Sequence, residues 1–369
     1  MFKRYKIKNY DFGLIFLLIA ISIIGILSVG SAEASLQNKQ IIGLILGLFL
    51  MVVLSLFDYS FFLNFYWLFY IANIILLLGV KYFGINVGGS TRWINILGIQ
   101  FQPSEVTKII LILFYAQFIM KHKEQINKLK TLLILVLLLL PSLLLILDQP
   151  DLSTSILIVA MFAAIVFIGG LSYKIVAGIL VVAIPAFAII FTMILQPDQT
   201  LILDYQQTRI LAWLHPFEYA NAEGYQQANS ITAIGSGQLF GKGLNNNVIG
   251  SVKNGNFIPK PETDFIFSIV GEELGFIGSC LVIILLILIA LKCLMIAKQA
   301  KDLAGTLICT GMAAVVGFQS FLNIAVATGV LPNTGIPLPF VSYGLTSLVS
   351  MFIGMGFVLN IRLQSNKKY

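Results

Sequence analysis

Charged residues are scarce in this sequence. Asp, Glu, Lys and Arg together make up only 11% of its 369 residues, whereas 58% of the residues are hydrophobic. A soluble protein of ordinary composition carries roughly a quarter of its residues as charges. The composition therefore excludes an ordinary water-soluble protein and indicates a single polytopic membrane domain over residues 1–369.

Cysteine and histidine are also rare, and their spacing excludes several kinds of site. The three cysteines (Cys280, Cys293 and Cys309) form neither an even set for disulfides nor a zinc-binding pattern, so we expect them to be buried packing residues. His122 and His215 lie far apart and on opposite sides of the expected membrane, so no metal site or Ser-His-Asp triad can use both. No metal ligands are predicted. A Gly-rich phosphate-binding motif is also missing, which argues against an ATP-driven pump.

Long apolar runs recur along the chain. A helix needs roughly 20 such residues to cross a hydrocarbon core of about 30 Å. The sequence therefore predicts an all-α integral membrane protein with about ten transmembrane helices, at residues 12–30, 41–57, 63–80, 103–120, 131–147, 152–169, 172–195, 275–297, 303–330 and 342–361.

One connection is much longer than the others. Residues 196–262 separate the seventh span from the eighth, and a connection of this length is usually functional or disordered. Its aromatic residues and Gly-rich turns argue against disorder. We expect short amphipathic or re-entrant helices in this loop.

Lys and Arg are distributed unevenly about the spans. Fifteen of the 23 lie in the termini and in the connections on the same side. By the positive-inside rule that side is cytoplasmic, so both termini are expected in the cytoplasm and the 196–262 loop outside. The net charge of +7 does not indicate nucleic acid, because Lys and Arg cluster between the apolar spans and form no basic face with interleaved aromatic residues. The basic N-terminus lacks a convincing small-residue cleavage site and is interpreted as leading into a retained first helix.

Acidic residues gather where the chain re-enters the membrane, in segment 260–278. Carboxylates there are costly unless they are hydrated or paired. Asp264 lies at the boundary between loop and helix. Either it or Thr263 could cap the eighth span, or Asp264 could be a catalytic carboxylate. Glu272 and Glu273 follow about 12–14 Å further along a helix. We expect them to be a first-turn or interfacial pair favoured by the helix dipole, with direct chemistry as the alternative.

Glu105 and Lys108 lie three residues apart on one face of the predicted fourth span. Pro103, just before them, suits the first turn of a helix. The spacing predicts an intramembrane ion pair. Such a pair would neutralise two expensive charges as structural support, or it would line a polar path.

Other polar residues are expected at the outer membrane edge. Arg92 and Arg209 could bind a pyrophosphate through their guanidinium groups, or they could be attracted to anionic headgroups. Asp148 and Asp151 flank Pro150, and Asp151 is expected to cap the sixth span, with a bound cation as the alternative.

Several motifs occur in one order along nearly the whole chain. They are RWI at 92–94, QPSE at 102–105 with Lys108, QPDLSTS at 149–155, AIGSGQLFGKG at 233–243, TDFIF and GEELG within 263–275, and PLPFVSYG at 337–344. Together they resemble the shape, elongation, division and sporulation family. The phrase DLSTSILIVA followed by GGLSYK is closer to the RodA branch of that family than to the FtsW branch.

This resemblance implies a peptidoglycan glycosyltransferase that polymerises lipid II at the outer face of the bacterial cytoplasmic membrane, for cell elongation, shape or division. It implies a class B penicillin-binding protein as partner, together with other membrane proteins of the elongation or division complex. The family's essential outer-loop aspartate maps onto Asp264. That residue would take the proton from the acceptor sugar.

The remaining candidate residues are of two kinds. Those for substrate binding are Arg92, Arg209, Lys242 and Glu262, and those for a polar cavity are Glu105, Lys108 and Asp151. A divalent cation, Mg²⁺ or Mn²⁺, could offset the pyrophosphate charge alongside the arginines. Two other functions are compatible with the same residues: a flippase for the lipid-linked precursor, and a non-catalytic scaffold of the cell-wall complex.

Overall fold

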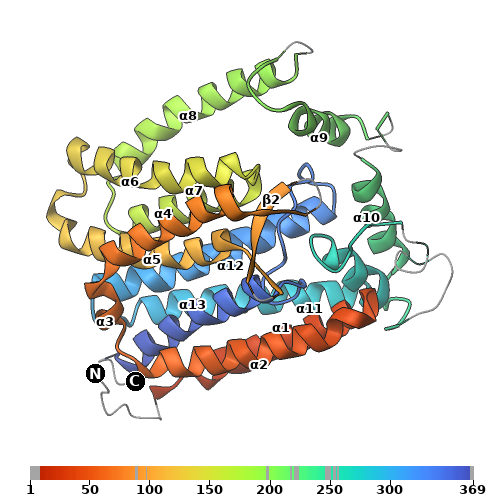
Figure 1. Cartoon of the computed structure of the whole chain (residues 1–369), viewed down its shortest axis with the longest axis horizontal. Helices are drawn as coiled ribbons and strands as arrows, with labels where there is room; N and C mark the ends of the chain where they lie inside the picture. Colours follow the sequence, from red (N-terminus) through yellow and green to blue (C-terminus); the bar gives the residue numbers. More distant parts are fainter. Residues whose placement is uncertain are drawn as a thin grey trace.

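The computed structural model describes residues 9–87, 90–96, 98–196, 199–216, 218–219, 224–245, 251, 255 and 257–365. It is a bundle of helices whose two ends of chain lie at the same end of the bundle (Figure 1). The helices are α1 (Phe12–Ala32), α2 (Ala34–Leu56), α3 (Tyr59–Asn64), α4 (Tyr66–Phe83), α5 (Pro103–Lys121), α6 (Leu129–Asp148), α7 (Leu152–Ile168), α8 (Tyr173–Ile194), α9 (Asp204–Leu214), α10 (Tyr225–Ser236), α11 (Ile266–Ala297), α12 (Leu303–Ala327) and α13 (Leu345–Leu363).

The long helices match the predicted spans in order. Within the described ranges, nine helices are long and apolar enough to cross a membrane, and α7 is a shorter apolar helix of 17 residues. A helix satisfies its own backbone N–H and C=O groups, as a segment in hydrocarbon must. The predicted all-α membrane fold with about ten spans is therefore confirmed, and the chain is a multi-pass membrane protein.

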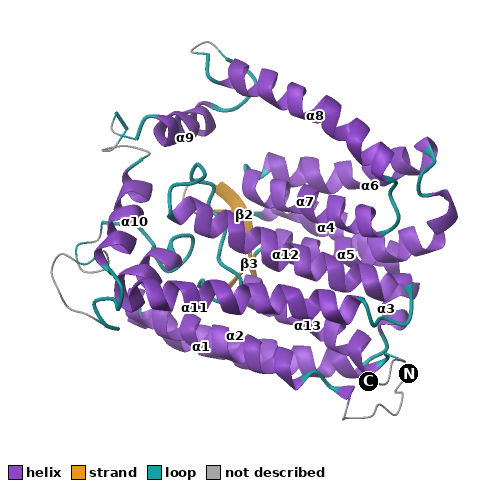
Figure 2. Ribbon diagram, turned by 180° about the vertical axis from the view of Figure 1, so that it is seen from behind, coloured by secondary structure: helices purple, strands orange, loops and turns teal. Residues whose placement is uncertain are grey.

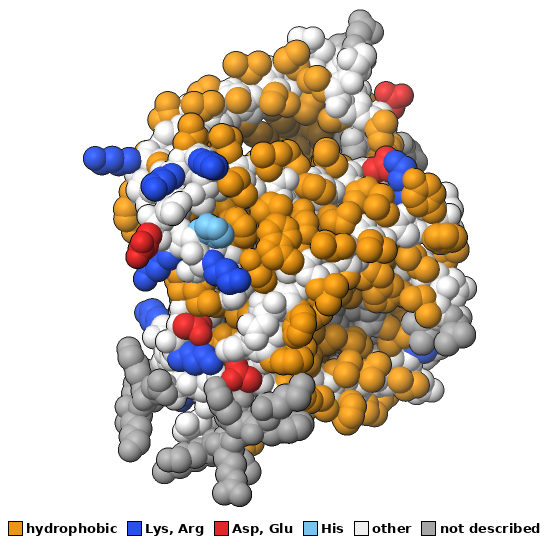
Figure 3. All heavy atoms as spheres, turned by 60° about the vertical axis from the view of Figure 1, so that its left-hand side comes forward, with side chains coloured by type: hydrophobic (Ala, Val, Ile, Leu, Met, Phe, Trp, Pro, Cys, Tyr) orange, Lys and Arg blue, Asp and Glu red, His pale blue; other side chains and the backbone are white. Residues whose placement is uncertain are grey.

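The outside of the bundle is apolar, as lipid contact requires. Figure 3 shows hydrophobic side chains over much of one face, with Lys and Arg gathered toward one margin. Phe16 on α1 is 70% exposed and Val181 on α8 is 72% exposed. In water such a surface would drive aggregation, whereas in a bilayer it meets acyl chains.

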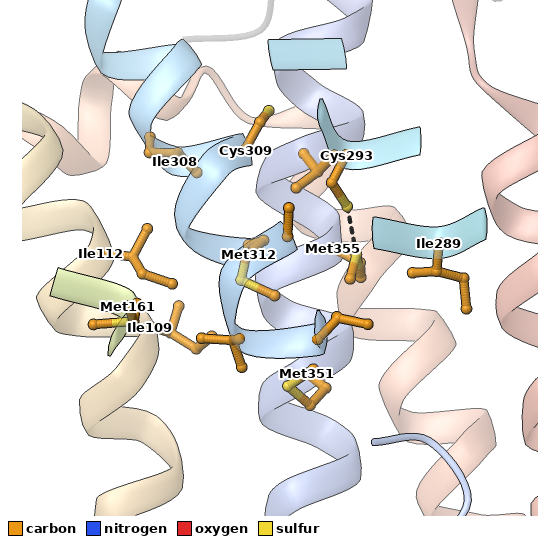
Figure 4. Close-up of a cluster of buried hydrophobic side chains, with 14 of the residues drawn as sticks. Ile109, Ile112, Met161, Ile289, Cys293, Ile308, Cys309, Met312, Met351 and Met355 are labelled. Carbon is orange, nitrogen blue, oxygen red and sulfur yellow. Dashed lines mark hydrogen bonds between the residues drawn. The ribbon is translucent and has the colours of Figure 1, made fainter. Parts of the chain in front are cut away.

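The core is built around α5 and α12. The central helix α12 packs against α5, α7, α11 and α13. Figure 4 shows their side chains interdigitating, with the Cys293 Sγ 3.8 Å from the Met355 Sδ. Cys293 and Cys309 are buried as predicted, whereas Cys280 is partly exposed, so the packing interpretation is wrong for that residue.

Helix α8 stands off from the other helices (Figures 1 and 2). None of its residues is buried in the described structure. Ser172 caps it by accepting a hydrogen bond from the N–H of Ile175 at 3.4 Å. Gly169 and Gly170 end α7, between the predicted spans 152–169 and 172–195.

Two short elements lie in connections for which no structure was predicted. Helix α3 follows α2, and a three-stranded antiparallel sheet joins α4 to α5. Its strands are β1 (Ile85–Val87), β2 (Ser90–Ile96) and β3 (Ile99–Phe101), and Ile94 of β2 pairs with Phe101 of β3. β1 and β3 have only three residues each, and the seven residues of β2 show no alternation of buried and exposed side chains, which is why a period-two pattern did not reveal them.

Helix α11 is interrupted at Gly275, which has φ 67° and ψ −162°. The eighth span was predicted to begin at residue 275, whereas the helix begins at Ile266 and its first part ends at this break. The positive φ favours glycine, because an added side chain would clash with the backbone. Helix α10 and the loop 237–243 pack against the first part of α11. The predicted short helices of the long connection are present as α9 and α10.

Candidate functional site

Asp264 lies in the turn directly before α11. This part of α11 packs against α10, at the end of the bundle away from the two chain ends (Figure 1). The Asp264 side chain is partly exposed. It is therefore neither sealed among apolar neighbours nor at the end that carries the termini.

The backbone around Asp264 is held by the segment that follows α12. We call residues 328–344, between α12 and α13, the return segment. The Ser342 Oγ donates to the carbonyl of Thr263 at 2.6 Å, and the N–H of Tyr343 donates to the carbonyl of Glu262 at 2.8 Å. The turn is thus fixed by two successive residues of the return segment.

The alternative of Asp264 or Thr263 as a helix cap is wrong for the described contacts. The N-cap residue of α11 is Phe265, and no side-chain cap hydrogen bond forms there. The Thr263 Oγ1 donates instead to the carbonyl of Lys260 at 3.0 Å. The Asp264 carboxylate therefore does not cap the N-terminus of α11, and helix capping does not account for an acidic residue at this position.

The electrostatic surroundings of Asp264 favour proton transfer near neutral pH. Loss of hydration raises the pKa of the Asp264 carboxyl from 3.8 to about 6. Arg92 and Arg209 act in the opposite direction by favouring the carboxylate, whereas Asp151 and Glu262 raise the pKa further. Two predicted cations and two predicted acids thus act on one carboxyl group, although they come from four different parts of the chain.

Arg92 connects the small sheet to the start of α7. From β2, its Nε donates to the carbonyl of Gln149 at 3.1 Å, and its Nη2 donates to the carbonyl of Pro150. Its Nη1 lies 3.8 Å from the Asp151 Oδ1. Asp151 also accepts from the N–H of Thr154 at 3.1 Å, so the predicted cap of the sixth span is confirmed.

Arg209 and Glu262 reach the site from the long connection between α8 and α11. Arg209 lies on α9 with its guanidinium over the ring of Tyr205, 5.5 Å from the ring centroid. Glu262 is nearly buried two residues before Asp264. Their roles toward a substrate stay predictions.

Lys242 lies against Glu272 of α11. The ammonium is 2.7 Å from the Glu272 carboxylate, which is 2% exposed. The Ser31 Oγ of α1 donates to the neighbouring Glu273 at 2.5 Å. Both glutamates are buried near the end of the first part of α11, so the first-turn or interfacial interpretation of this pair is wrong. The helix dipole does not favour anions there, and Lys242 and Ser31 stabilise them instead.

Glu105 and Lys108 form the predicted ion pair, with 2.9 Å between the Lys108 Nζ and the Glu105 Oε2. Both side chains are almost completely buried. The Lys108 ammonium also donates to the Gln319 Oε1 on α12 at 2.9 Å. The pair is therefore embedded in a hydrogen-bonded network between two core helices.

Sequence reasoning passed over Gln319, Asn323 and Gly335, and it met Ser342 only as part of the PLPFVSYG motif. Gln319 and Asn323 are polar residues inside the predicted ninth span, which was the available signal, because polar side chains within a membrane segment are expensive. Gly335 has φ 70°, and a Cβ there would lie 3.1 Å from the Asp264 Oδ2. Such long-range proximity leaves no local trace in the sequence.

Comparison with known proteins gives matches over almost the entire chain. A model of the FtsW, RodA and SpoVE family, described as cell cycle protein, matches residues 4–367. The peptidoglycan glycosyltransferase MrdB of Escherichia coli K12 is 34% identical over 344 residues, covering 93% of this chain and 90% of MrdB. The probable peptidoglycan glycosyltransferase FtsW of Bacillus subtilis is 30% identical, covering 99% of this chain and 94% of FtsW.

Solved structures share the fold. One, from work on the structural coordination of polymerization and crosslinking by a peptidoglycan synthase complex, has a TM-score of 0.80 at 30% identity and covers 96% of this chain and 97% of that one. The rod shape determining protein RodA of Thermus thermophilus has a TM-score of 0.71 at 28% identity, covering 97% and 98%. The chain therefore belongs to the shape, elongation, division and sporulation family of FtsW, RodA and SpoVE.

Proposed function

We propose that this chain is a peptidoglycan glycosyltransferase that polymerises lipid II into glycan strands, for cell elongation, shape or division. The observation that carries the proposal is the Asp264 carboxyl, partly exposed at the bundle end away from the termini, with its pKa raised to about 6. The names of its relatives give the reaction class.

Asp264 is the general base. It takes the proton from the 4-hydroxyl of the acceptor GlcNAc as that oxygen forms a bond to the anomeric carbon of the donor. The bond from this carbon to the undecaprenyl pyrophosphate breaks, and the pyrophosphate leaves with the electron pair. A base whose pKa is about 6 is mostly ionised at neutral pH and still accepts a proton readily.

One carboxylate is sufficient for this reaction. A glycosidase needs a second carboxyl group to protonate a sugar alcohol as it leaves. A pyrophosphate leaves as an anion and needs positive charge instead. Arg92 and Arg209, whose charges act on Asp264, are proposed to supply it. The guanidinium of Arg92 has five N–H groups and is already oriented by two carbonyl acceptors.

A divalent cation, Mg²⁺ or Mn²⁺, stays a prediction. In the described ranges, no group of three or more His, Cys, Asp and Glu side chains is placed to hold a metal ion. Mg²⁺ often binds one or two carboxylates together with substrate phosphates. We propose that the pyrophosphate oxygens of the bound substrate would hold such a cation, which would leave Asp264 free to act as the base and would supply positive charge to the leaving group.

The proposed placement has both termini in the cytoplasm of a bacterium and Asp264 at the outer face of its cytoplasmic membrane. The uneven distribution of Lys and Arg supports this orientation. The proposed partner is a class B penicillin-binding protein that crosslinks the glycan, alongside other elongation or division proteins. A structural neighbour from a complex that coordinates polymerization and crosslinking supports this partner.

The test is polymerisation of labelled lipid II by the purified chain in detergent, alone and with a class B penicillin-binding protein. We expect glycan chains from the parent protein and at least about a hundredfold less product from Asp264→Asn, which keeps size and removes basicity. A parent that makes no glycan in detergent but moves lipid II across sealed vesicles would instead be a flippase. Wild-type product from Asp264→Asn would refute the assignment of the base.

A further inference from the structure

Two buried amide side chains lie one helical turn apart on α12. Gln319 and Asn323 are 0% and 1% exposed, and their four-residue spacing places them on one face of the helix. Both make hydrogen bonds to main-chain carbonyls outside α12. Buried side-chain amides in a membrane helix are expensive, so their contacts need a reason.

Asn323 joins two separate segments with a single amide group. Its Nδ2 donates to the main-chain carbonyl of Asp264 at 2.7 Å and to that of Ile336 at 2.7 Å. An amide nitrogen carries two N–H donors, and both are thereby used. The turn that carries Asp264 and the return segment are thus fastened to the same point of α12.

The acceptor end of the same amide is not satisfied. The Asn323 Oδ1 is buried and has no hydrogen-bond partner in the part of the chain that the structure describes. A buried polar atom without a partner costs roughly 1–3 kcal/mol. The residue therefore serves through its two donors, and the fold tolerates the unfavourable acceptor.

Gln319 connects the return segment to the ion pair in the core. Its Nε2 donates to the carbonyl of Pro337 at 2.9 Å, and its Oε1 accepts from Lys108 at 2.9 Å. Lys108 is fixed in turn by Glu105. The return segment is thus held at two adjacent residues, Ile336 and Pro337, by a network that begins at the buried charges of α5.

The return segment passes close to the Asp264 carboxylate. At Gly335, next to Ile336, a Cβ would lie 3.1 Å from the Asp264 Oδ2. A displacement of Ile336 therefore moves the backbone against which the carboxylate rests. Asn323 holds the carbonyl of Ile336, next to Gly335, and also the carbonyl of Asp264. It therefore fixes the position of the return segment and of the carboxylate relative to each other.

We infer that Asn323 is a positioning residue for Asp264, and that Gln319 supports it by fixing the next residue of the return segment. The inference rests on the proposed function, in which Asp264 is the base. Asn323 acts by holding the Asp264 carboxylate in a site from which water is partly excluded. Without Asn323, two carbonyls lose their donors and recruit water beside the carboxylate.

This role predicts a change in the titration of Asp264. The charged groups that act on it are Arg92 of β2, Asp151 at the start of α7, Arg209 of α9 and Glu262 of its own turn. Substitution of Asn323 alters none of these charges. The main cause of the raised pKa is loss of hydration, so admitted water lowers it.

The experiment compares Asn323→Ala with the parent in two measurements. Lipid II polymerisation gives kcat and KM, and infrared difference titration against Asp264→Asn gives the pKa of Asp264 without turnover. We expect kcat to fall by about 10- to 100-fold with little change in KM, because small misplacements of a reacting group have effects of this size. We expect the pKa of Asp264 to fall by about one unit.

Asn360→Ala is the matched control. Asn360 is equally buried on α13, where it accepts from the N–H of Tyr59 at 2.9 Å and donates to the carbonyl of Ser55 at 2.7 Å. It is expected to lower the melting temperature without changing the Asp264 titration. The inference is overturned if Asn323→Ala leaves both kcat and the pKa of Asp264 at the parent values. It is also overturned if Asn360→Ala changes these two quantities as much as Asn323→Ala does.

Asn323→Ser, together with Asp264→Asn, keeps the outcomes separate. Asn323→Ser retains one of the two donors and is expected to show intermediate shifts, and it serves if the alanine variant does not fold. An unchanged titration in the serine variant also overturns the inference. Full activity of Asp264→Asn would refute the proposed base, whereas the infrared titration of Asn323 variants would still decide whether Asn323 positions Asp264.

Discussion

Lys242 and Glu272 are joined twice. The Lys242 ammonium lies 2.7 Å from the Glu272 carboxylate, and the main-chain N–H of Lys242 donates to the main-chain carbonyl of Glu272 at 2.9 Å. The N–H of Phe276, just past the break at Gly275, donates to the carbonyl of Gln238 at 2.8 Å. The loop that follows α10 therefore supplies partners to backbone groups on both sides of the break in α11.

Lys242→Met is expected to lower the free energy of unfolding in detergent by about 2 kcal/mol, because it removes a cation from a carboxylate that is 2% exposed. Lys81→Met is the control, since its partner Asp148 is 53% exposed at a similar distance of 2.9 Å. A loss of less than about 1 kcal/mol is expected there. Equal losses in thermal unfolding would show that burial of the partner is unimportant.

Glu105→Ala and Lys108→Ala are each expected to destabilise the protein by about 3–5 kcal/mol, because each leaves the other charge buried in the core. The double substitution Glu105→Gln with Lys108→Met removes both charges at similar volume and is expected to cost less than either single change. Denaturation in detergent of this double variant and of its matching single variants, Glu105→Gln and Lys108→Met, gives the coupling energy. Strictly additive losses would contradict an ion pair.

The polymerisation rate is expected to depend on the ionisation of Asp264. Below about pH 6, kcat/KM should fall tenfold per pH unit, because the base becomes protonated. A flat profile between pH 4.5 and pH 7 would argue against this role.

Stability is expected to change with pH in the opposite sense. The folded pKa of Asp264, about 6, lies above its ordinary value of 3.8, so the folded state binds more protons between these values. The stabilisation is complete below pH 3.8 and is lost as the pH rises through about 6. Subtraction of the curve for Asp264→Asn isolates this contribution, and a difference that does not vary with pH would contradict the raised pKa.

Gly335→Ala is expected to lower the polymerisation rate by about tenfold, because φ is positive there and the new methyl group would press on the Asp264 carboxylate. Gly178→Ala on α8 is the control, since a Cβ at that position meets nothing within 4 Å. It is expected to keep the parent rate and to gain up to about 1 kcal/mol from the better helix propensity of Ala. Equal rates of the two variants would show that the contact at Gly335 does not constrain Asp264.

Much of the fold follows from local sequence. Hydropathy placed the spans because each membrane helix satisfies its own backbone hydrogen bonds and must be apolar along its length. The pairing of Glu105 with Lys108 was predictable because residues three apart share a helical face. Asp151 as a cap was predictable for the same reason, since its partner Thr154 is three residues away.

Other features could not be read from the sequence. The start of α11 at Ile266 depends on the loop after α10, which supplies partners for backbone groups at the Gly275 break. The position of α8 away from the bundle has no local signal, because a helix in contact with lipid and a helix in contact with protein are both apolar.

Sequence alone therefore determined that this protein is a helical membrane protein, where its spans lie, and, through its motifs, that Asp264 is the residue to examine. Only the tertiary structure brought Arg92, Asp151 and Arg209 within electrostatic reach of that carboxyl and tied its backbone to Asn323, 59 residues away. Helix formation depends on neighbours a few residues apart, whereas the hydration of a carboxylate depends on whatever the packed helices bring beside it.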